Sequence, residues 1–199
     1  MSLDDLRLVY VIGCFMLGLI ILSPTLAMII NLPGGERFTE LWILGPEHMA
    51  ENYPFNIVSG QTYNISLGIA NHMGCLEYYA VYVKLRSLNE PLPNSTTGTP
   101  SSLDPLFEYR VFLRDGGVWE QRPLPFSFEF SFGDGFCNVS RLILDGYVKG
   151  VNKTVLWDAE NKGYYLMLFF ELWIYNSGDS SFKYHNRFVS LWLNLTSYV

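Results

Sequence analysis

Apolar and polar residues alternate over many short segments of the chain, and this alternation predicts β-strands. Successive side chains of a strand point to opposite faces, so a period of two gathers the apolar residues on one face. In segment 62–70, apolar side chains alternate with Thr, Asn, Ser and Gly. In segment 79–86, the same pattern predicts that Lys84 and Arg86 face solvent. Further strands are predicted at 38–44, 107–114, 126–132, 164–175 and 189–196.

Together these segments predict an all-β fold. Strands with a single apolar face need a second apolar layer, which two facing antiparallel sheets supply. We therefore expect one Ig-like antiparallel β-sandwich over residues 33–199, with 164–175, apolar on both faces, as a central strand. The Pro-, Ser- and Thr-rich segment 91–105 predicts an exposed connector. Segment 133–162 is less regular, and we expect an insertion with one short element near 141–148.

The N-terminal segment has a different pattern. Leu8–Leu32 contains 25 residues and no charged side chain. At about 1.5 Å per residue such a helix reaches about 37 Å, more than the roughly 30 Å hydrocarbon core of a bilayer. We predict a transmembrane helix over 8–32 after a short cytoplasmic segment, 1–7. A cleaved signal peptide ending at Thr25-Leu26-Ala27 is the alternative, which the continuation of the apolar run through Met28–Ile30 disfavours.

Acceptor sites for N-linked glycans follow the apolar segment. Any single Asn-x-Ser/Thr sequence is weak support for glycosylation, but all of those in this chain lie on the C-terminal side of the predicted helix. They therefore predict a single-pass protein of the cell membrane whose glycosylated C-terminal domain is extracellular. The acceptor asparagines are Asn64, Asn94, Asn138, Asn152 and Asn194.

Charge and motifs provide no sign of chemistry. The formal charge of −6 lacks the clustered Lys and Arg of a nucleic-acid-binding protein. The three cysteines have no Cys-x-x-Cys spacing, and no catalytic or nucleotide-binding motif occurs. His72, at a predicted strand end, is the strongest candidate ligand, and Asp134 and Asp158 lie in loops without EF-hand spacing. We predict no catalytic residue, no metal site and no cofactor.

Several sequence segments resemble a known family. These segments are 38–47 (FTELWILGPE), 50–54 (AENYP), 58–72, which ends in Asn-His, 113–120 (LRDGGVWE) and 184–195. In order and spacing they resemble the largely archaeal membrane-protein family called domain of unknown function 1616. The resemblance implies a membrane-anchored, extracytoplasmic Ig-like domain, and it implies no activity.

The chain departs from the family pattern in three places. It has one predicted span where many relatives have several, and it contains Met73-Gly74-Cys75 and the long stretch 133–162. Cys75 and Cys137 fall within these departures, so we predict a disulfide between them, as in exported proteins.

These inferences lead to a functional hypothesis. We expect a non-enzymatic envelope protein with a structural or interaction role, and we expect its partners to be membrane lipid, N-linked glycans and other surface proteins or copies of itself. One alternative is a pilin-like filament subunit, which also joins an apolar helix to a sandwich. The other is an envelope enzyme, which would need a cleft with convergent titratable groups.

Overall fold

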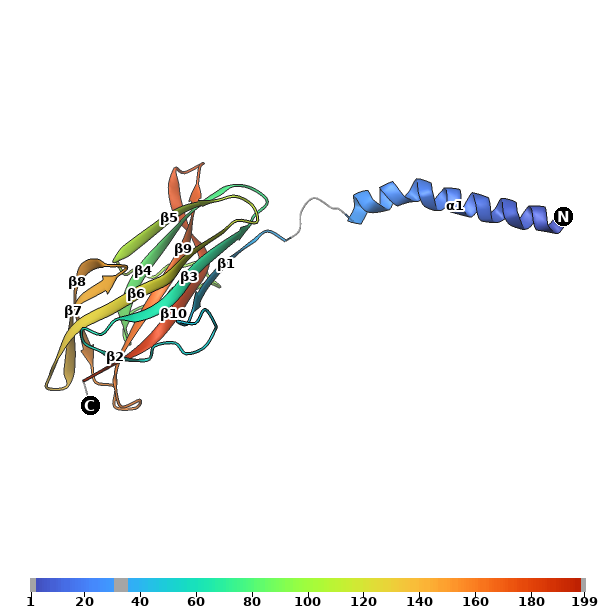
Figure 1. Cartoon of the computed structure of the whole chain (residues 1–199). Coiled ribbons are helices and arrows are strands. Elements are labelled where there is room, and N and C mark those ends of the chain that lie inside the picture. The colour runs from blue at the N-terminus through green and yellow to red at the C-terminus, as the bar shows by residue number, and fades with distance from the viewer. Residues whose placement is uncertain (1–2, 31–35, 198–199) are drawn as a thin grey trace. The chain divides into compact units, whose positions relative to one another are not determined.

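A computed structural model describes residues 3–30 and 36–197, and within the helix it describes the side chains of residues 7–23. The chain forms two separate units, 1–37 and 38–199 (Figure 1). The first contains one helix, α1 (Leu3–Ile30). Among the described residues, no helix has both the length and the hydropathy needed to cross a membrane. The last residues of the predicted span, 31 and 32, lie outside the described part of the chain.

The second unit is a sandwich of two five-stranded sheets (Figure 1). Sheet A has the order β1-β3-β6-β7-β8, and sheet B has the order β2-β10-β9-β4-β5. Strand pairing is antiparallel except between β2 and β10. The strands are β1 (Phe38–Leu44), β2 (Asn56–Val58), β3 (Tyr63–His72), β4 (Glu77–Ser87), β5 (Phe107–Leu113), β6 (Val118–Gly133), β7 (Phe136–Leu144), β8 (Tyr147–Leu156), β9 (Tyr164–Asn176) and β10 (Ser181–Thr196).

The core lies between the sheets and consists of the apolar side chains that the alternation placed inward. Tyr79, Val81 and Val83 of β4 are fully buried, as is Phe128 of β6. Removing side chains of this size from water contributes roughly 1.5 to 3 kcal/mol each before entropy is counted. β9 is the middle strand of sheet B, and Leu166 to Leu172 are buried on both of its faces, which confirms the predicted central strand.

Segment 133–162 contains a two-stranded hairpin of β7 and β8, so the prediction of an insertion with one short element is wrong. β7 and β8 pair across a two-residue turn at Asp145 and Gly146, both with positive φ, as type I′ hairpins require. The strand pattern was hidden because a register shift between Val139 and Arg141 changes which residues face the core. Cys137 and Val139 point inward before the shift, and Leu142 and Leu144 after it.

The prediction that Lys84 and Arg86 face solvent is also wrong, because the connector 91–105 contacts Lys84, and Arg86 donates to the Ser87 and Leu88 carbonyls beside the Trp192 ring. Both side chains are more than 90% buried. Lys84 Nζ lies 2.8 Å from Glu171 Oε2 of β9 and donates to the Ser101 carbonyl at 2.8 Å. The Ser101 amide in turn donates to Glu171 Oε1 at 2.8 Å. The connector is thus fastened by its backbone to a buried ion pair.

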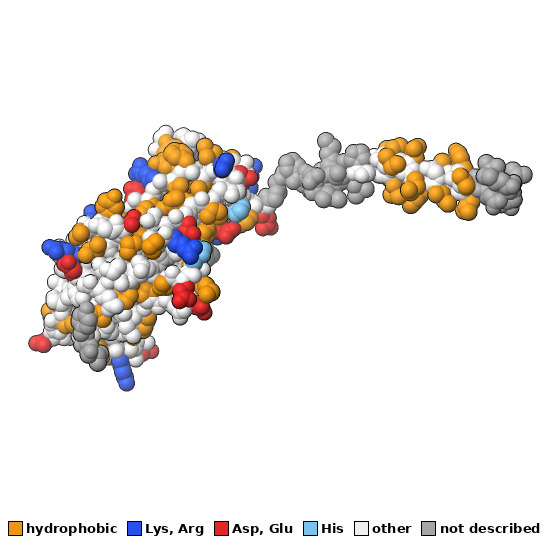
Figure 2. Space-filling model, viewed as in Figure 1, with side chains coloured by type: hydrophobic (Ala, Val, Ile, Leu, Met, Phe, Trp, Pro, Cys, Tyr) orange, Lys and Arg blue, Asp and Glu red, His pale blue; other side chains and the backbone are white. Residues whose placement is uncertain are grey.

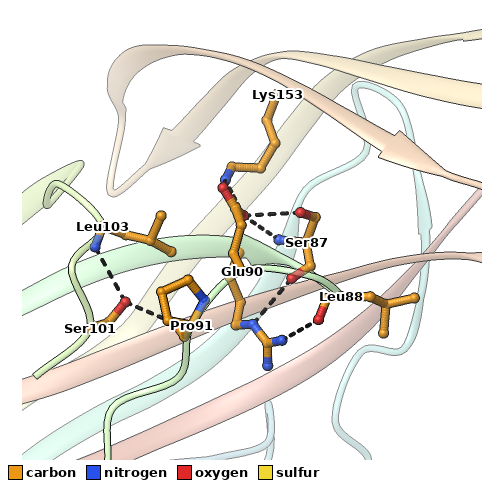
Figure 3. A network of polar contacts seen from close by, with 8 residues as sticks. Ser87, Leu88, Glu90, Pro91, Ser101, Leu103 and Lys153 are labelled. Atoms are coloured by element: carbon orange, nitrogen blue, oxygen red, sulfur yellow. Dashed lines mark hydrogen bonds and ion pairs between the residues drawn. The ribbon is translucent and has the colours of Figure 1, made fainter. Parts of the chain in front are cut away.

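A second contact fastens the start of the connector to sheet A (Figure 3). Glu90 accepts hydrogen bonds from the Ser87 amide at 2.7 Å and from Lys153 Nζ of β8 at 2.6 Å. Burial raises the pKa of Glu90, but the hydrogen bonds from Lys153 and Ser87 outweigh it, and the net pKa is lowered. Glu90 is therefore ionised at neutral pH, and the connector bridges the two sheets.

Candidate functional site

The candidate site is a wedge between β5 and β6. The turn 114–117 connects β5 to β6, and the Gly117 amide donates a 2.8 Å hydrogen bond to the Arg114 carbonyl within it. The two strands belong to different sheets, so they diverge from this turn. β6 pairs with β3 from Val118 onward, but its pairing with β7 begins only at Phe126. Residues 118–125 of β6 therefore have a strand neighbour on one side only, and β5 is an edge strand.

This wedge is hollow. It forms a cleft of about 640 Å³, which we call the wedge cleft. Its lining includes Tyr109 of β5 and Trp119 of β6, whose ring centroids are 5.6 Å apart. Tyr147, the first residue of β8, is 71% exposed at the rim, and Phe107 completes a set of four aromatic rings. Clefts of this size that combine rings with a few polar groups are typical of ligand sites.

Polar groups face the same cleft. Gln121 Nε2 donates to Asp145 Oδ2 at 3.3 Å, which links the two side chains, whereas the Arg110–Glu108 ion pair lies on the outer face of sheet B, where the Arg110 guanidinium is 5.2 Å from the centroid of the Phe182 ring. Burial, followed by the charges of Asp145 and Tyr147, raises the pKa of Tyr109, whose hydroxyl therefore stays protonated. With the ammonium group of Lys149, the lining offers both donors and acceptors. The arrangement can bind a ligand rich in hydrogen-bonding groups.

Four of the five acceptor asparagines are exposed on the sandwich. Asn64, Asn138 and Asn152 lie on strands of sheet A, and Asn94 lies in the connector over sheet B. All four stand where an attached glycan would extend into solvent.

Asn194 differs from the other four acceptor asparagines because it is only partly exposed. Its Nδ2, the atom to which a glycan would be attached, donates to Asn56 Oδ1 at 3.0 Å. Its Oδ1 is buried, and a Cβ on Gly163 would lie only 2.6 Å from it. The Asn194 amide is therefore packed between β2 and the start of β9.

Comparison with known families identifies the first half of the sandwich. The family described as Domain of unknown function (DUF1616) matches residues 32–131, half of the chain. The chain belongs to the DUF1616 family. No curated protein matches it. The DUF1616 match includes β1 to β5 and most of β6, so the resembling segment 184–195 lies outside it.

The wedge cleft joins residues inside the DUF1616 match to residues beyond it. Tyr109 and Trp119 lie within the matched segment, whereas Asp145 and Tyr147 belong to the β7–β8 hairpin. The sequence analysis did not find this site. The Asp145-Gly146 pair was an available signal for a hairpin turn, but no sequence signal places that turn opposite β5.

The predicted Cys75–Cys137 disulfide does not form in this DUF1616 structure. Cys137 is a buried thiol in β7, opposite Phe132 at one end of β6, and burial raises its pKa to about 12. Cys75 lies beside the other end of β6, next to the β5–β6 turn, with its Sγ 3.0 Å from Glu77 Oε1. The β6 residues between these ends span roughly 45 Å at about 3.3 Å per residue, far beyond the reach of a disulfide.

The histidines are engaged in local contacts. The His72 ring stacks on Phe38 with centroids 4.5 Å apart, and its Nε2 lies 3.0 Å from Glu40 Oε1. His48 Nε2 lies 2.6 Å from Glu120 Oε1, which also accepts from the Trp42 indole at 3.3 Å. Within the described part of the chain, no group of three His, Cys, Asp or Glu residues could hold a metal ion.

Three aromatic side chains on strands of sheet B separate into two groups. Tyr82 and Trp173 lie on the face of sheet B, with ring centroids 5.1 Å apart, and the Trp173 indole donates to Glu171. Trp192 carries the Arg86 guanidinium 5.6 Å above its ring and lines a smaller cleft of about 340 Å³. Tyr82 and Trp173 therefore pack within the domain, and Trp192 forms part of the surface.

Proposed function

We propose that this chain is a membrane-anchored, N-glycosylated protein of the cell surface, of archaeal type, whose Ig-like sandwich has a structural or interaction role in the envelope. The observation that carries the proposal is the exposure of Asn64, Asn94, Asn138 and Asn152 on both outer sides of the sandwich. A modifying enzyme needs an accessible amide nitrogen in each acceptor sequence, and these four sites supply it.

The anchor is proposed from the composition and exposure of α1. Between Leu8 and Leu32 there is no charge, and from Leu8 to Leu22 the large apolar side chains are about half to three-quarters exposed. Figure 2 presents hydrophobic side chains over the visible face of this described part. A helix with so many apolar side chains and no charge between Leu8 and Leu32 is stabilised by lipid rather than by water. The proposed span runs over 8–32, of which the structure describes the side chains to residue 23.

The Ig-like assignment is proposed from connectivity. The chain crosses between the sheets at β1–β2, β2–β3, β3–β4, β5–β6 and β8–β9, and crossings of this kind join the two antiparallel sheets of Ig-like sandwiches. β6, β7 and β8 are consecutive neighbours in sheet A, however, and this meander elaborates the Ig-like arrangement.

A pilin-like filament subunit is the second candidate, favoured by the union of an apolar helix with a sandwich. N-terminal sequencing of the protein from membranes separates the two proposals. A retained Met1 supports the surface anchor, and a trimmed N-terminus followed by filament assembly supports the pilin-like role.

The glycosylation proposal is tested by replacing each acceptor asparagine with Gln in the full chain. Loss of one glycan should increase the electrophoretic mobility of each single variant. These variants are Asn64→Gln, Asn94→Gln, Asn138→Gln and Asn152→Gln. Asn194→Gln is the matched control and should leave mobility unchanged, because Asn194 Nδ2 donates to Asn56 Oδ1 at 3.0 Å and Asn194 Oδ1 is buried. Five variants that all migrate like the parent would reject glycosylation.

A further inference from the structure

We propose that the wedge cleft binds a neutral oligosaccharide, a short run of uncharged hexose units. The inference deepens the proposed surface role and rests on it for its biological setting. The cleft volume of about 640 Å³ falls within the range of ligand pockets, roughly 300 to 1,000 Å³.

The aromatic rings provide surfaces for the apolar faces of sugars. One face of a pyranose ring presents C–H groups, which pack on aromatic rings in the way that other apolar groups do. Tyr147 is 71% exposed at the rim, so one face of its ring is available without displacing any protein atom. Trp119 and Tyr109 lie deeper and contact each other, which gives the cleft a rigid base.

The polar lining matches hydroxyl groups, which both donate and accept. Asp145 is held by Gln121 and retains carboxylate lone pairs for sugar hydroxyls. The protonated hydroxyl of Tyr109 and the ammonium group of Lys149 supply donors. A hydroxyl-rich ligand can use both types of group at once.

Charge decides between neutral and ionic ligands. Asp145 contributes one negative charge to the lining and Lys149 one positive charge, so their formal sum is zero, and Glu108 and Arg110 point to the opposite face of β5 from Tyr109. Glu108 and Arg110 are already paired with each other. A nucleotide or an acidic sugar would find no excess of positive charge, and the cleft therefore favours an uncharged ligand.

An extended peptide that adds a strand to β6 is the rival ligand. The Pro125 carbonyl accepts a hydrogen bond from the Asp145 amide at 2.9 Å, so Pro125 presents its backbone to the wedge side of β6. Proline has no N–H, and an added strand would lack a donor at this position. The edge is thus poorly suited to strand addition. None of the acceptor asparagines lines the cleft, so no glycan would be attached within it.

The test is calorimetric titration of the full chain with neutral trisaccharides of glucose, mannose and N-acetylglucosamine. The protein is kept in a zwitterionic detergent, since a maltoside headgroup would itself occupy the site. We expect saturable binding of at least one trisaccharide, weakened about fivefold or more by Tyr147→Ala or by Asp145→Asn. Asn adopts the positive φ of residue 145 readily, so the hairpin turn is retained.

Phe112→Ala is the matched control, because Phe112 is 64% exposed and does not line the cleft. The affinity of the Phe112→Ala variant for the trisaccharide should equal that of the parent. No binding of any neutral trisaccharide, or an equal loss in Phe112→Ala and Tyr147→Ala, would overturn the proposal. Binding of an extended Val-Thr peptide with no sugar binding would assign the cleft to strand addition instead.

A measurement of self-association of the glycosylated chain, with and without the trisaccharide, distinguishes two sources of the sugar. Dissociation of oligomers by the bound trisaccharide would identify glycans on neighbouring copies as the ligand. Trisaccharide binding that leaves the association state unchanged would identify a separate polysaccharide, and both results support the cleft. Because the titration is made in detergent, it is independent of topology, and a failure of the surface role would leave its result unaffected.

Discussion

Asn71 shows how one side chain can hold the end of the sandwich together. It is fully buried, and its Nδ2 donates to the carbonyls of Cys75 at 2.8 Å and Leu113 at 2.7 Å. Its Oδ1 accepts from the Met73 amide and from the Tyr79 hydroxyl, both at 3.0 Å. The resemblance to the family drew attention to this residue, but the partner on β5 lies 42 residues away, and no local pattern encodes such a contact.

Replacing Asn71 should therefore be costly. Asn71→Ala leaves several buried donors and acceptors without partners, and we expect the free energy of unfolding to fall by about 3 to 5 kcal/mol. Tyr79→Phe removes one of the same hydrogen bonds and should cost about 1 kcal/mol. Urea denaturation followed by tryptophan fluorescence measures both. Equal costs for the two variants would show that Asn71 does not organise this turn.

The strands were predictable where alternation is uninterrupted, as in β3, which was predicted at 62–70 and spans Tyr63–His72. β2 has only three residues, too few to establish a period, and it depends on pairing with β10 for its formation. β7 and β8 were missed because a bulge changes the phase of the pattern. Sequence periodicity therefore identifies strands but does not determine what covers their outer faces.

The connector is an element whose attachment can be tested through the buried ion pair. Lys84→Met alone leaves the fully buried Glu171 carboxylate without its cation, and we expect a loss of about 3 to 5 kcal/mol in unfolding free energy. Adding Glu171→Leu removes the isolated charge and should restore most of this loss. Thermal unfolding of the single variant, the double variant and the parent measures these differences in stability. A double variant no more stable than the single one would contradict this account of the connector.

The attachment of the connector to β8 should depend on pH. The folded pKa of Glu90 is lowered, so its contribution is fully present above the ordinary glutamate value near 4.5 and is lost as the pH falls through the folded pKa. We expect limited proteolysis of the connector to increase in the parent below about pH 4.5. In the Glu90→Gln variant, the protease should cleave the connector readily at every pH. Glu160 is an exposed loop residue, so the Glu160→Gln variant should be cleaved like the parent. A parent profile that is flat with pH would contradict this role for Glu90.

The whole molecule combines an apolar helix with a β-sandwich of the DUF1616 family. The two-layer architecture followed from the number of strands with one apolar face, because only a second sheet can cover them. The wedge cleft did not follow, since it exists where β7 stops pairing with β6 and where β5 diverges into the other sheet. Sites of this kind depend on strand lengths and crossings that alternation does not specify.

Labelling of intact cells tests the surface topology most directly. All five lysines of the chain lie in the sandwich, and Lys149, Lys162 and Lys183 are exposed. A membrane-impermeant amine reagent should therefore label peptides containing these three lysines before the cells are broken, while the α-amine of Met1 stays unlabelled. Labelling of the lysines only after permeabilisation, with the α-amine reacting in intact cells, would contradict the proposed orientation and with it the role at the cell surface.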